Sequence, residues 1–242
     1  MHLRRRTRYV AVLLLAAATS LGAQSANLSG HWEGSIKVPG MELRVEIDLA
    51  AASGGALTGT MSIPSQNVKG LPFLNVAVEG KSVTFNSRDD QVFKGTLSAN
   101  GQALSGILDM SGFTIPFSLA RTGDPKIEPL EKSPPIGKEL EGTWNAKARV
   151  KGAPPMQFVL TLSNQPDGTA SGALVNVEEG GLRIPVTITQ QGANVTLQGK
   201  AVGSTYSGAL NAEGMELAGT YTQGSVATPL TFRRAAAIGT KK

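Results

Sequence analysis

The stretch Leu28-Ser-Gly-His-Trp-Glu-Gly-Ser-Ile-Lys-Val38 decides the fold, because the chain repeats it as Leu140-Glu-Gly-Thr-Trp-Asn-Ala-Lys-Ala-Arg-Val150. Both copies read Leu-x-Gly-x-Trp and continue as an alternating run. Alternation with a period of two is typical of a β-strand with one buried face. Each copy opens a segment of about 95 residues, so the pair predicts two related β-domains in tandem.

The similarity continues at a nearly constant offset of 112 or 113 residues along each segment. The matching pairs include Gly59 with Gly172, Pro72 with Pro185, Phe93–Leu97 with Tyr206–Leu210, and Pro116–Arg121 with Pro229–Arg234. Chance matches do not hold one register over such a length. The chain therefore contains an internal duplication.

Within each copy, short alternating runs are separated by turn signals such as Pro39-Gly40 and Asp167-Gly168. In each copy we expect about eight strands, which in the first lie near 31–38, 42–51, 56–63, 71–79, 82–88, 91–98, 103–110 and 113–121. Eight sequential strands with tight turns predict an up-and-down antiparallel meander. Closing each meander into a barrel would remove its exposed edges. An open sandwich is the alternative.

Glycines recur inside these strands in the pattern apolar-x-Gly-x-apolar, for example at Gly34, Gly59, Gly95 and Gly106. Their parity places each glycine on the inward face. A glycine inside a strand marks a tight bend or a close approach of another backbone. Two interpretations remain: strand coiling at the corners of a small barrel, or space left in the lumen for a ligand.

The opening tryptophans have expected partners at the end of each copy. Arg121 and Arg234 share the inward parity of their last strands, and in a closed meander the last strand pairs with the first. We therefore expect Arg121 to stack on Trp32 and Arg234 on Trp144, each contact contributing about 0.5–2 kcal/mol. Such a pair closes one end of a barrel or, alternatively, contacts a ligand.

The N-terminus predicts export. A basic region with Arg4, Arg5, Arg6 and Arg8 precedes an apolar core at 10–18, and residues 1–23 read as a signal peptide cleaved after Ala23. An uncleaved anchor is the alternative. The formal net charge of +5 includes those four arginines, so the mature chain is near +1. We expect a periplasmic or secreted protein with no transmembrane span in its mature form and no affinity for nucleic acid.

The expected domains follow from the repeat. The first barrel covers 27–121 and the second covers 139–234. Between them, 122–138 contains four prolines and predicts a semi-rigid, extended linker. Residues 235–242 predict a disordered tail.

Composition and motifs argue against catalysis. The chain has no cysteine, which removes disulfides, thiol chemistry and cysteine-based metal sites. It also lacks Gly-x-Ser-x-Gly and a Gly-rich phosphate loop. The mature chain has one histidine, His31, whose outward parity predicts a surface position. The paired carboxylates at 89–90 and 178–179 fall in expected loops. We predict a protein that is not an enzyme and needs no cofactor or metal.

Several motifs resemble a known module. Gly30-His-Trp32-Glu-Gly34, Pro39-Gly40-Met-Glu-Leu43-Arg44-Val45, Gly70-Leu71-Pro72 and Pro229-Leu-Thr-Phe-Arg233-Arg234 resemble the all-β N-terminal module of secreted bacterial α/β-hydrolases of the serine aminopeptidase type. The catalytic domain of those hydrolases is missing, so their catalytic residues have no counterpart here. The opening motif Leu-x-Gly-x-Trp, together with residues 55–60, also resembles the start of avidins and, more loosely, of lipocalins. Avidin-type sites need several tryptophans, whereas each copy has one, so biotin binding is not expected.

Binding remains as the expected task. The inward positions are apolar, so we expect a non-catalytic binding or interaction protein whose partner is an apolar small molecule or another protein. An accessory or regulatory module of a secreted hydrolase system is the alternative. The candidate ligand contacts are Trp32, Gln66, Arg121, Trp144, Gln223 and Arg234, with Asn67 and Lys69 beside Gln66 as further rim positions.

Overall fold

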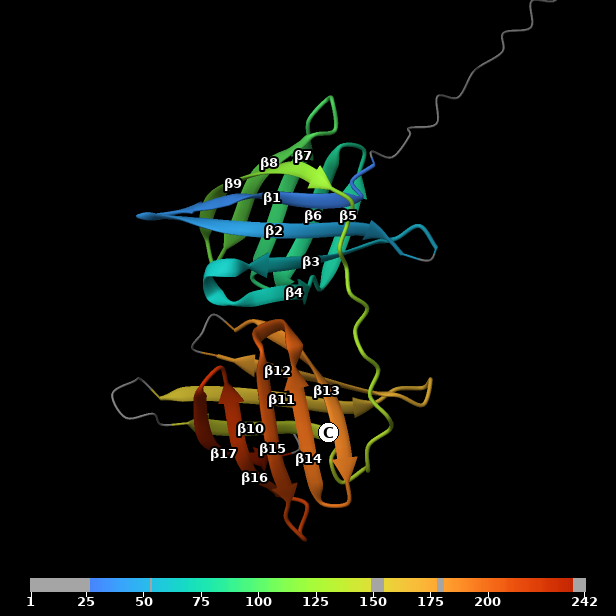
Figure 1. Cartoon of the computed structure of the whole chain (residues 1–242), viewed down its shortest axis with the longest axis vertical. Helices are drawn as coiled ribbons and strands as arrows, with labels where there is room; N and C mark the ends of the chain where they lie inside the picture. Colours follow the sequence, from blue (N-terminus) through green and yellow to red (C-terminus); the bar gives the residue numbers. More distant parts are fainter. Residues whose placement is uncertain (1–26, 53, 149–154, 178–180, 237–242) are drawn as a thin grey trace, which may run out of the picture.

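The computed structural model describes residues 27–52, 54–148, 155–177 and 181–236 as two antiparallel sheets, one stacked on the other (Figure 1). The predicted signal peptide and the tail beyond residue 236 lie outside the described residues. The strands of the first sheet are β1 (Gly30–Val38), β2 (Met41–Ala51), β3 (Leu57–Ile63), β4 (Val68–Pro72), β5 (Asn75–Glu79), β6 (Ser82–Arg88), β7 (Gln91–Leu97), β8 (Ala103–Met110) and β9 (Phe113–Gly123). Those of the second are β10 (Gly142–Ala148), β11 (Met156–Asn164), β12 (Ala170–Asn176), β13 (Arg183–Gln191), β14 (Asn194–Gly199), β15 (Ser204–Leu210), β16 (Glu216–Gln223) and β17 (Val226–Arg234).

The second repeat confirms the predicted architecture. Its eight strands pair with their neighbours in chain order and form a closed barrel, with β10 next to β17. β13 forms one corner, because its first half pairs with β12 through Val186 and its second half pairs with β14 from Thr187 onward. One strand thus belongs to two successive ladders.

The first repeat is an all-β, curled sheet of nine strands, close to the expected number of about eight. The order β4-β3-β2-β1-β9-β8-β7-β6-β5 leaves β4 and β5 at the two edges, where a single strand over 71–79 was expected. The strand breaks at Phe73 and Leu74, where the backbone turns from one ladder to the other. The Phe73 N–H donates to Gly59 O at 2.9 Å, and the Leu74 N–H donates to Asn86 O at 2.8 Å. These two bonds attach the break between β4 and β5 to β3 on one side and to β6 on the other.

The strand glycines are sites of close approach. A Cβ atom on Gly34 would lie 1.9 Å from the backbone oxygen of Ser118, and one on Gly106 would lie 1.9 Å from that of Lys94. A Cβ on Gly95 would meet the Leu104 side chain at 2.9 Å. None of these positions faces empty space. Strand coiling therefore explains the glycines, and space for a ligand does not.

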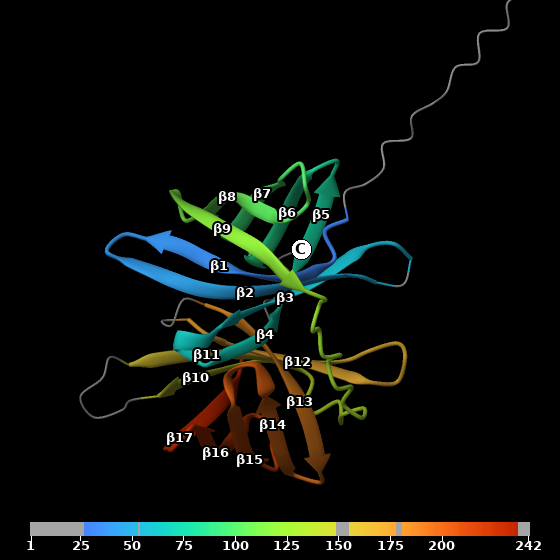
Figure 2. The same ribbon diagram turned by 45° about the horizontal axis from the view of Figure 1, so that its top comes forward.

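The two repeats touch directly. Two short 3₁₀ turns lie at the contact, η1 (Pro64–Gln66) in the first repeat and η2 (Lys200–Val202) in the second, and η2 packs on β4. Val68, Ala201 and Val202 are buried in one apolar cluster. Figure 2 shows the same arrangement from a second direction, with the chain after β9 running along one side of both sheets.

That connecting segment is extended and attached to both repeats. β9 continues to Gly123, two residues into the range expected to be linker. Farther along, Ser133 and Ile136 are buried against the second barrel. The Ser133 hydroxyl oxygen accepts the Ile188 N–H at 2.8 Å, and the Ala170 N–H donates to Ser133 O at 3.0 Å. The segment therefore covers part of the outer face of each sheet.

Candidate functional site

The predicted tryptophan–arginine contacts are present in both repeats. The Arg121 guanidinium lies 4.4 Å from the ring centre of Trp32, and that of Arg234 lies 4.2 Å from Trp144. Both tryptophans are fully buried. The Trp32 indole N–H donates to Leu28 O at 3.1 Å, and Trp144 makes the equivalent bond in its own repeat at 3.0 Å.

The arginines bind backbone rather than facing an open space. Arg121 Nε donates to Gly101 O at 3.0 Å, and Nη2 donates to Asn27 O at 2.6 Å. Arg234 Nε donates to Gly214 O at 2.9 Å. Neither of the two cavities described below includes these arginines or tryptophans among its lining residues. These four candidate residues close one end of each barrel.

Aromatic rings fill the interior of the first repeat. Phe85 lies 4.6 Å from Phe73 and 4.7 Å from Phe93, measured between ring centres, and Phe117 lies 5.5 Å from Phe93. Ring separations of 4.5–7 Å are those of favourable aromatic packing. The first lumen is therefore a packed core.

The second repeat carries smaller side chains at three of the four equivalent positions and a tyrosine at the fourth. The strand registers place Val186, Leu197, Tyr206 and Leu230 where the first repeat has Phe73, Phe85, Phe93 and Phe117. Burial raises the pKa of Tyr206, whose hydroxyl donates to Leu217 O at 2.8 Å, so it stays a neutral donor. The second repeat carries its rings at other positions, with Phe158 beside Tyr221 and Tyr206 beside Phe232.

A cavity of about 410 Å³ lies at the end of the second barrel opposite Arg234. Its apolar lining comes from Val68, Phe158, Leu174, Leu182, Ile184 and Val202, and its polar lining comes from Gln66, Asn176, Tyr221 and Gln223. Gln66 and Val68 belong to the first repeat, so both repeats build the cavity. Two sequence candidates, Gln66 and Gln223, thus line the same cavity.

The polar residues of this cavity have apolar counterparts in the first repeat. Asn176 pairs with Phe158 across β11 and β12. In the first repeat, the register of β2 and β3 places Ile63 opposite Val45, so Ile63 is the counterpart of Asn176. Tyr221 and Gln223 occupy the positions of Leu108 and Met110. The two copies therefore differ at this end: the first is apolar here, whereas the second has a cavity with polar residues at its mouth. Sequence analysis did not identify Asn176 or Tyr221, although comparison of the two copies carries the signal.

A larger cleft of about 940 Å³ lies between the repeats and the connecting segment. Its walls are mixed, with charged residues of both signs such as Lys69, Glu128, Glu131 and Lys200. Lys69 pairs with Glu128 at 3.6 Å, and Glu131 raises the pKa of Lys200 through a hydrogen bond. Asn67 and Lys69, expected on a rim loop, line this cleft instead, and Lys69 lies within β4.

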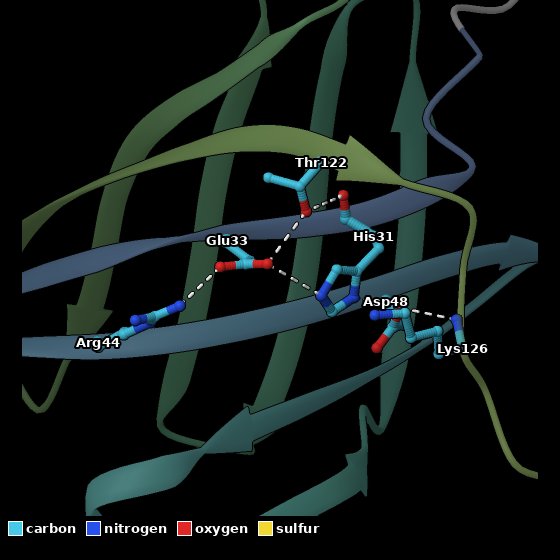
Figure 3. A network of polar contacts seen from close by, with 6 residues as sticks. All are labelled: His31, Glu33, Arg44, Asp48, Thr122 and Lys126. Carbon is cyan, nitrogen blue, oxygen red and sulfur yellow. Dashed lines mark hydrogen bonds and ion pairs between the residues drawn. The ribbon is translucent and has the colours of Figure 1, made fainter.

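The prediction that His31 lies on the surface is wrong, because only 5% of it is exposed. It does point away from the lumen, but the connecting segment covers that face (Figure 3). Its Nδ1–H donates to Asp48 Oδ1 at 2.7 Å, and the Lys126 backbone N–H donates to the same oxygen at 2.8 Å. On the other side of the ring, Glu33 Oε1 lies 3.5 Å from Nε2. A hydrogen bond from Arg44 holds the pKa of Glu33 below its usual value.

This cluster predicts a stability effect. Asp48→Asn should lower the free energy of unfolding by about 1–3 kcal/mol. The side-chain oxygen that accepts from His31 and from the Lys126 N–H would then belong to a neutral amide, which is a weaker acceptor than a carboxylate. Glu33→Gln, on the more exposed side of the same histidine, should cost less than about 1 kcal/mol. Urea unfolding of both variants checks this, and equal effects would contradict the assigned role of Asp48.

The remaining sequence candidates carry no reactive arrangement. Asp90 is paired with Arg88 through two bonds of 2.8 and 2.6 Å, which lower the pKa of the carboxyl group. Glu178 and Glu179 lie outside the described residues. Across the described ranges, no group of three or more histidine, aspartate and glutamate residues is placed to hold a metal ion. Nor does any helix among those residues have the length and apolarity to cross a membrane.

Comparison with known proteins gives distant structural likeness only. No protein-family profile matches the sequence, and no curated protein matches it. A protein of Bacteroides fragilis, provisionally described as an outer membrane protein, is 13% identical, with a TM-score of 0.28 over 88% of this chain and 99% of its own. A Nostoc punctiforme protein of unknown function, from the DUF3598 family, is also 13% identical, with a TM-score of 0.27 over 86% of this chain and 96% of its own. What the chain's own structure establishes is an all-β protein built from two tandem, barrel-like repeats.

Proposed function

We propose that the second repeat binds a small, predominantly apolar molecule in its mouth cavity, without transforming it. The observation that carries this proposal is the cavity of about 410 Å³ at the mouth of the second barrel, built from both repeats, whereas four phenylalanines pack the interior of the first repeat. Ligand sites in proteins are typically cavities of this size, lined by apolar side chains with a few placed polar groups. No serine, histidine or carboxylate stands among the described lining residues.

The proposed setting is outside the cytoplasm, supported by the basic and apolar N-terminal residues. The role of an accessory module to a secreted α/β-hydrolase stays a prediction from the sequence resemblance. A neighbouring gene for a hydrolase without this module would support it.

Ligand binding can be tested with the neutral fluorescent probe N-phenyl-1-naphthylamine. The full chain should enhance the probe's fluorescence saturably, and native mass spectrometry of freshly isolated protein should show a co-purifying small molecule. Leu174→Phe, which replaces a lining leucine with a bulkier aromatic ring, should weaken probe binding at least about tenfold, or 1.4 kcal/mol.

Met61 offers a matched control, because it occupies the position of Leu174 in the filled repeat. Met61→Phe should leave probe binding unchanged but destabilise the protein by about 1–3 kcal/mol through overpacking. Unchanged binding by Leu174→Phe, or no saturable binding by the unaltered chain, would overturn the proposal.

A further inference from the structure

We propose that the ligand of the second barrel is electrically neutral and ends in a hydrogen-bonding group, such as a hydroxyl, ketone or amide, held at the mouth between the repeats. This inference rests on the proposed function. It names the class of ligand, and it follows from the chemistry and position of the polar side chains.

The first step is the absence of charge. All ten described residues that line the cavity are uncharged. Arg88 lies next to the entrance, 3.5 Å from where a Cβ on Gly181 would be, but its guanidinium is bound at two points by Asp90. A carboxylate or ammonium group brought into such a cavity loses its hydration without gaining a partner of opposite charge. Charged amphiphiles such as fatty acids are therefore disfavoured.

The second step is the kind of polar group present. Asn176 and Gln223 carry amides and Tyr221 carries a phenol, so each can both donate and accept a hydrogen bond. The Tyr221 hydroxyl donates to Gln223 Oε1 at 3.1 Å, and Gln223 Nε2 donates to Val202 O at 3.3 Å. This chain of bonds fixes the Gln223 amide relative to the η2 turn. Groups that donate and accept are suited to neutral hydroxyls and carbonyls.

The third step is the position of these groups. Asn176 and Gln223 are the last residues of β12 and β16, at the open end of the barrel, whereas Leu174 and Phe158 lie deeper along their strands. Gln66 faces them from the η1 turn of the first repeat. The polar end of a ligand would thus lie between the repeats, and its apolar body would point into the barrel.

A series of ligands with one bicyclic body tests this assignment. Isothermal titration calorimetry on the full chain should give 2-naphthol a Kd at least tenfold lower than that of 2-naphthoate at pH 7. Its Kd should also be about fivefold lower than that of naphthalene, the advantage of one hydrogen bond. Gln223→Met, which places the first repeat's residue here, should remove the advantage over naphthalene. Met110→Gln, the reverse exchange in the filled repeat, should leave it unchanged.

The outcomes separate the two proposals. Equal affinity for 2-naphthoate and 2-naphthol would overturn the neutral-ligand assignment, and so would equal affinity for naphthalene and 2-naphthol. Either result, with N-phenyl-1-naphthylamine still binding, leaves the cavity itself as a binding site. Failure of every compound, including that probe, would overturn the proposed function and this assignment with it. Thermal unfolding of each variant confirms that it is folded.

Discussion

Replacing Gly34 by alanine is expected to prevent the first repeat from reaching its folded state. The added Cβ would lie 1.9 Å from the backbone oxygen of Ser118 and 2.8 Å from the Leu119 Cα. Both atoms belong to β9, which pairs with β1 through Gly34 and Leu119. A clash with backbone cannot be relieved by a rotamer change, so we expect a loss of more than about 4 kcal/mol.

The matched control is Gly123→Ala in the same strand β9, where a new Cβ meets nothing within 4 Å. This change should be neutral or stabilise by about 0.4–1 kcal/mol, because alanine restricts the unfolded chain. Circular dichroism during thermal unfolding compares the two. If the Gly34→Ala protein unfolds at the same temperature as the unaltered protein, β1 and β9 can move apart to accommodate the added Cβ, and the prediction fails.

Truncating the first tryptophan is expected to have the second largest effect. Trp32→Ala should cost about 3–5 kcal/mol, the usual range for a buried aromatic residue, and it also removes the stacked partner of Arg121. Because the chain has two tryptophans, one in each repeat, Trp32→Ala leaves Trp144 as the sole fluorescence reporter of the second repeat.

Guanidinium titration followed by tryptophan fluorescence and by circular dichroism then separates the repeats. In Trp32→Ala, circular dichroism should show an early transition from the first repeat, while Trp144 fluorescence changes later. Trp144→Ala should reverse the order. A single shared transition in both variants would show instead that the contact through Val68 and Val202 joins the repeats into one unfolding unit.

The sequence predicted the features that depend on local period and on chain order. Alternation assigns each strand residue to a face, and an up-and-down meander places the last strand beside the first. The stacking of Arg121 on Trp32 followed from these two rules alone. The break at Phe73 was not visible, because the backbone hydrogen bonds that span it depend on how far the sheet curls.

Features that depend on packing between distant segments could not be predicted. His31 has outward parity, but its burial depends on where the proline-rich segment lies, and no local pattern encodes that path. Gln66 and Gln223 come from different repeats and share a cavity only because η2 rests on β4. The mouth cavity of the second repeat is different, since aligning the copies already shows smaller residues opposite three of the four phenylalanines, and polar residues opposite Ile63, Leu108 and Met110.

The phenylalanine cluster of the first repeat has a consequence for how a binding cavity can be accommodated. A lone barrel has to reconcile two opposed demands, since a ligand chamber removes the dense packing that keeps a small domain folded. A tandem duplicate relaxes that conflict. The aromatic copy is densely packed and contacts the second repeat through Val68, so looser packing around a cavity in the second copy need not unfold the chain. The densely packed copy thus serves as a stabilising support for a neighbour that contains a cavity.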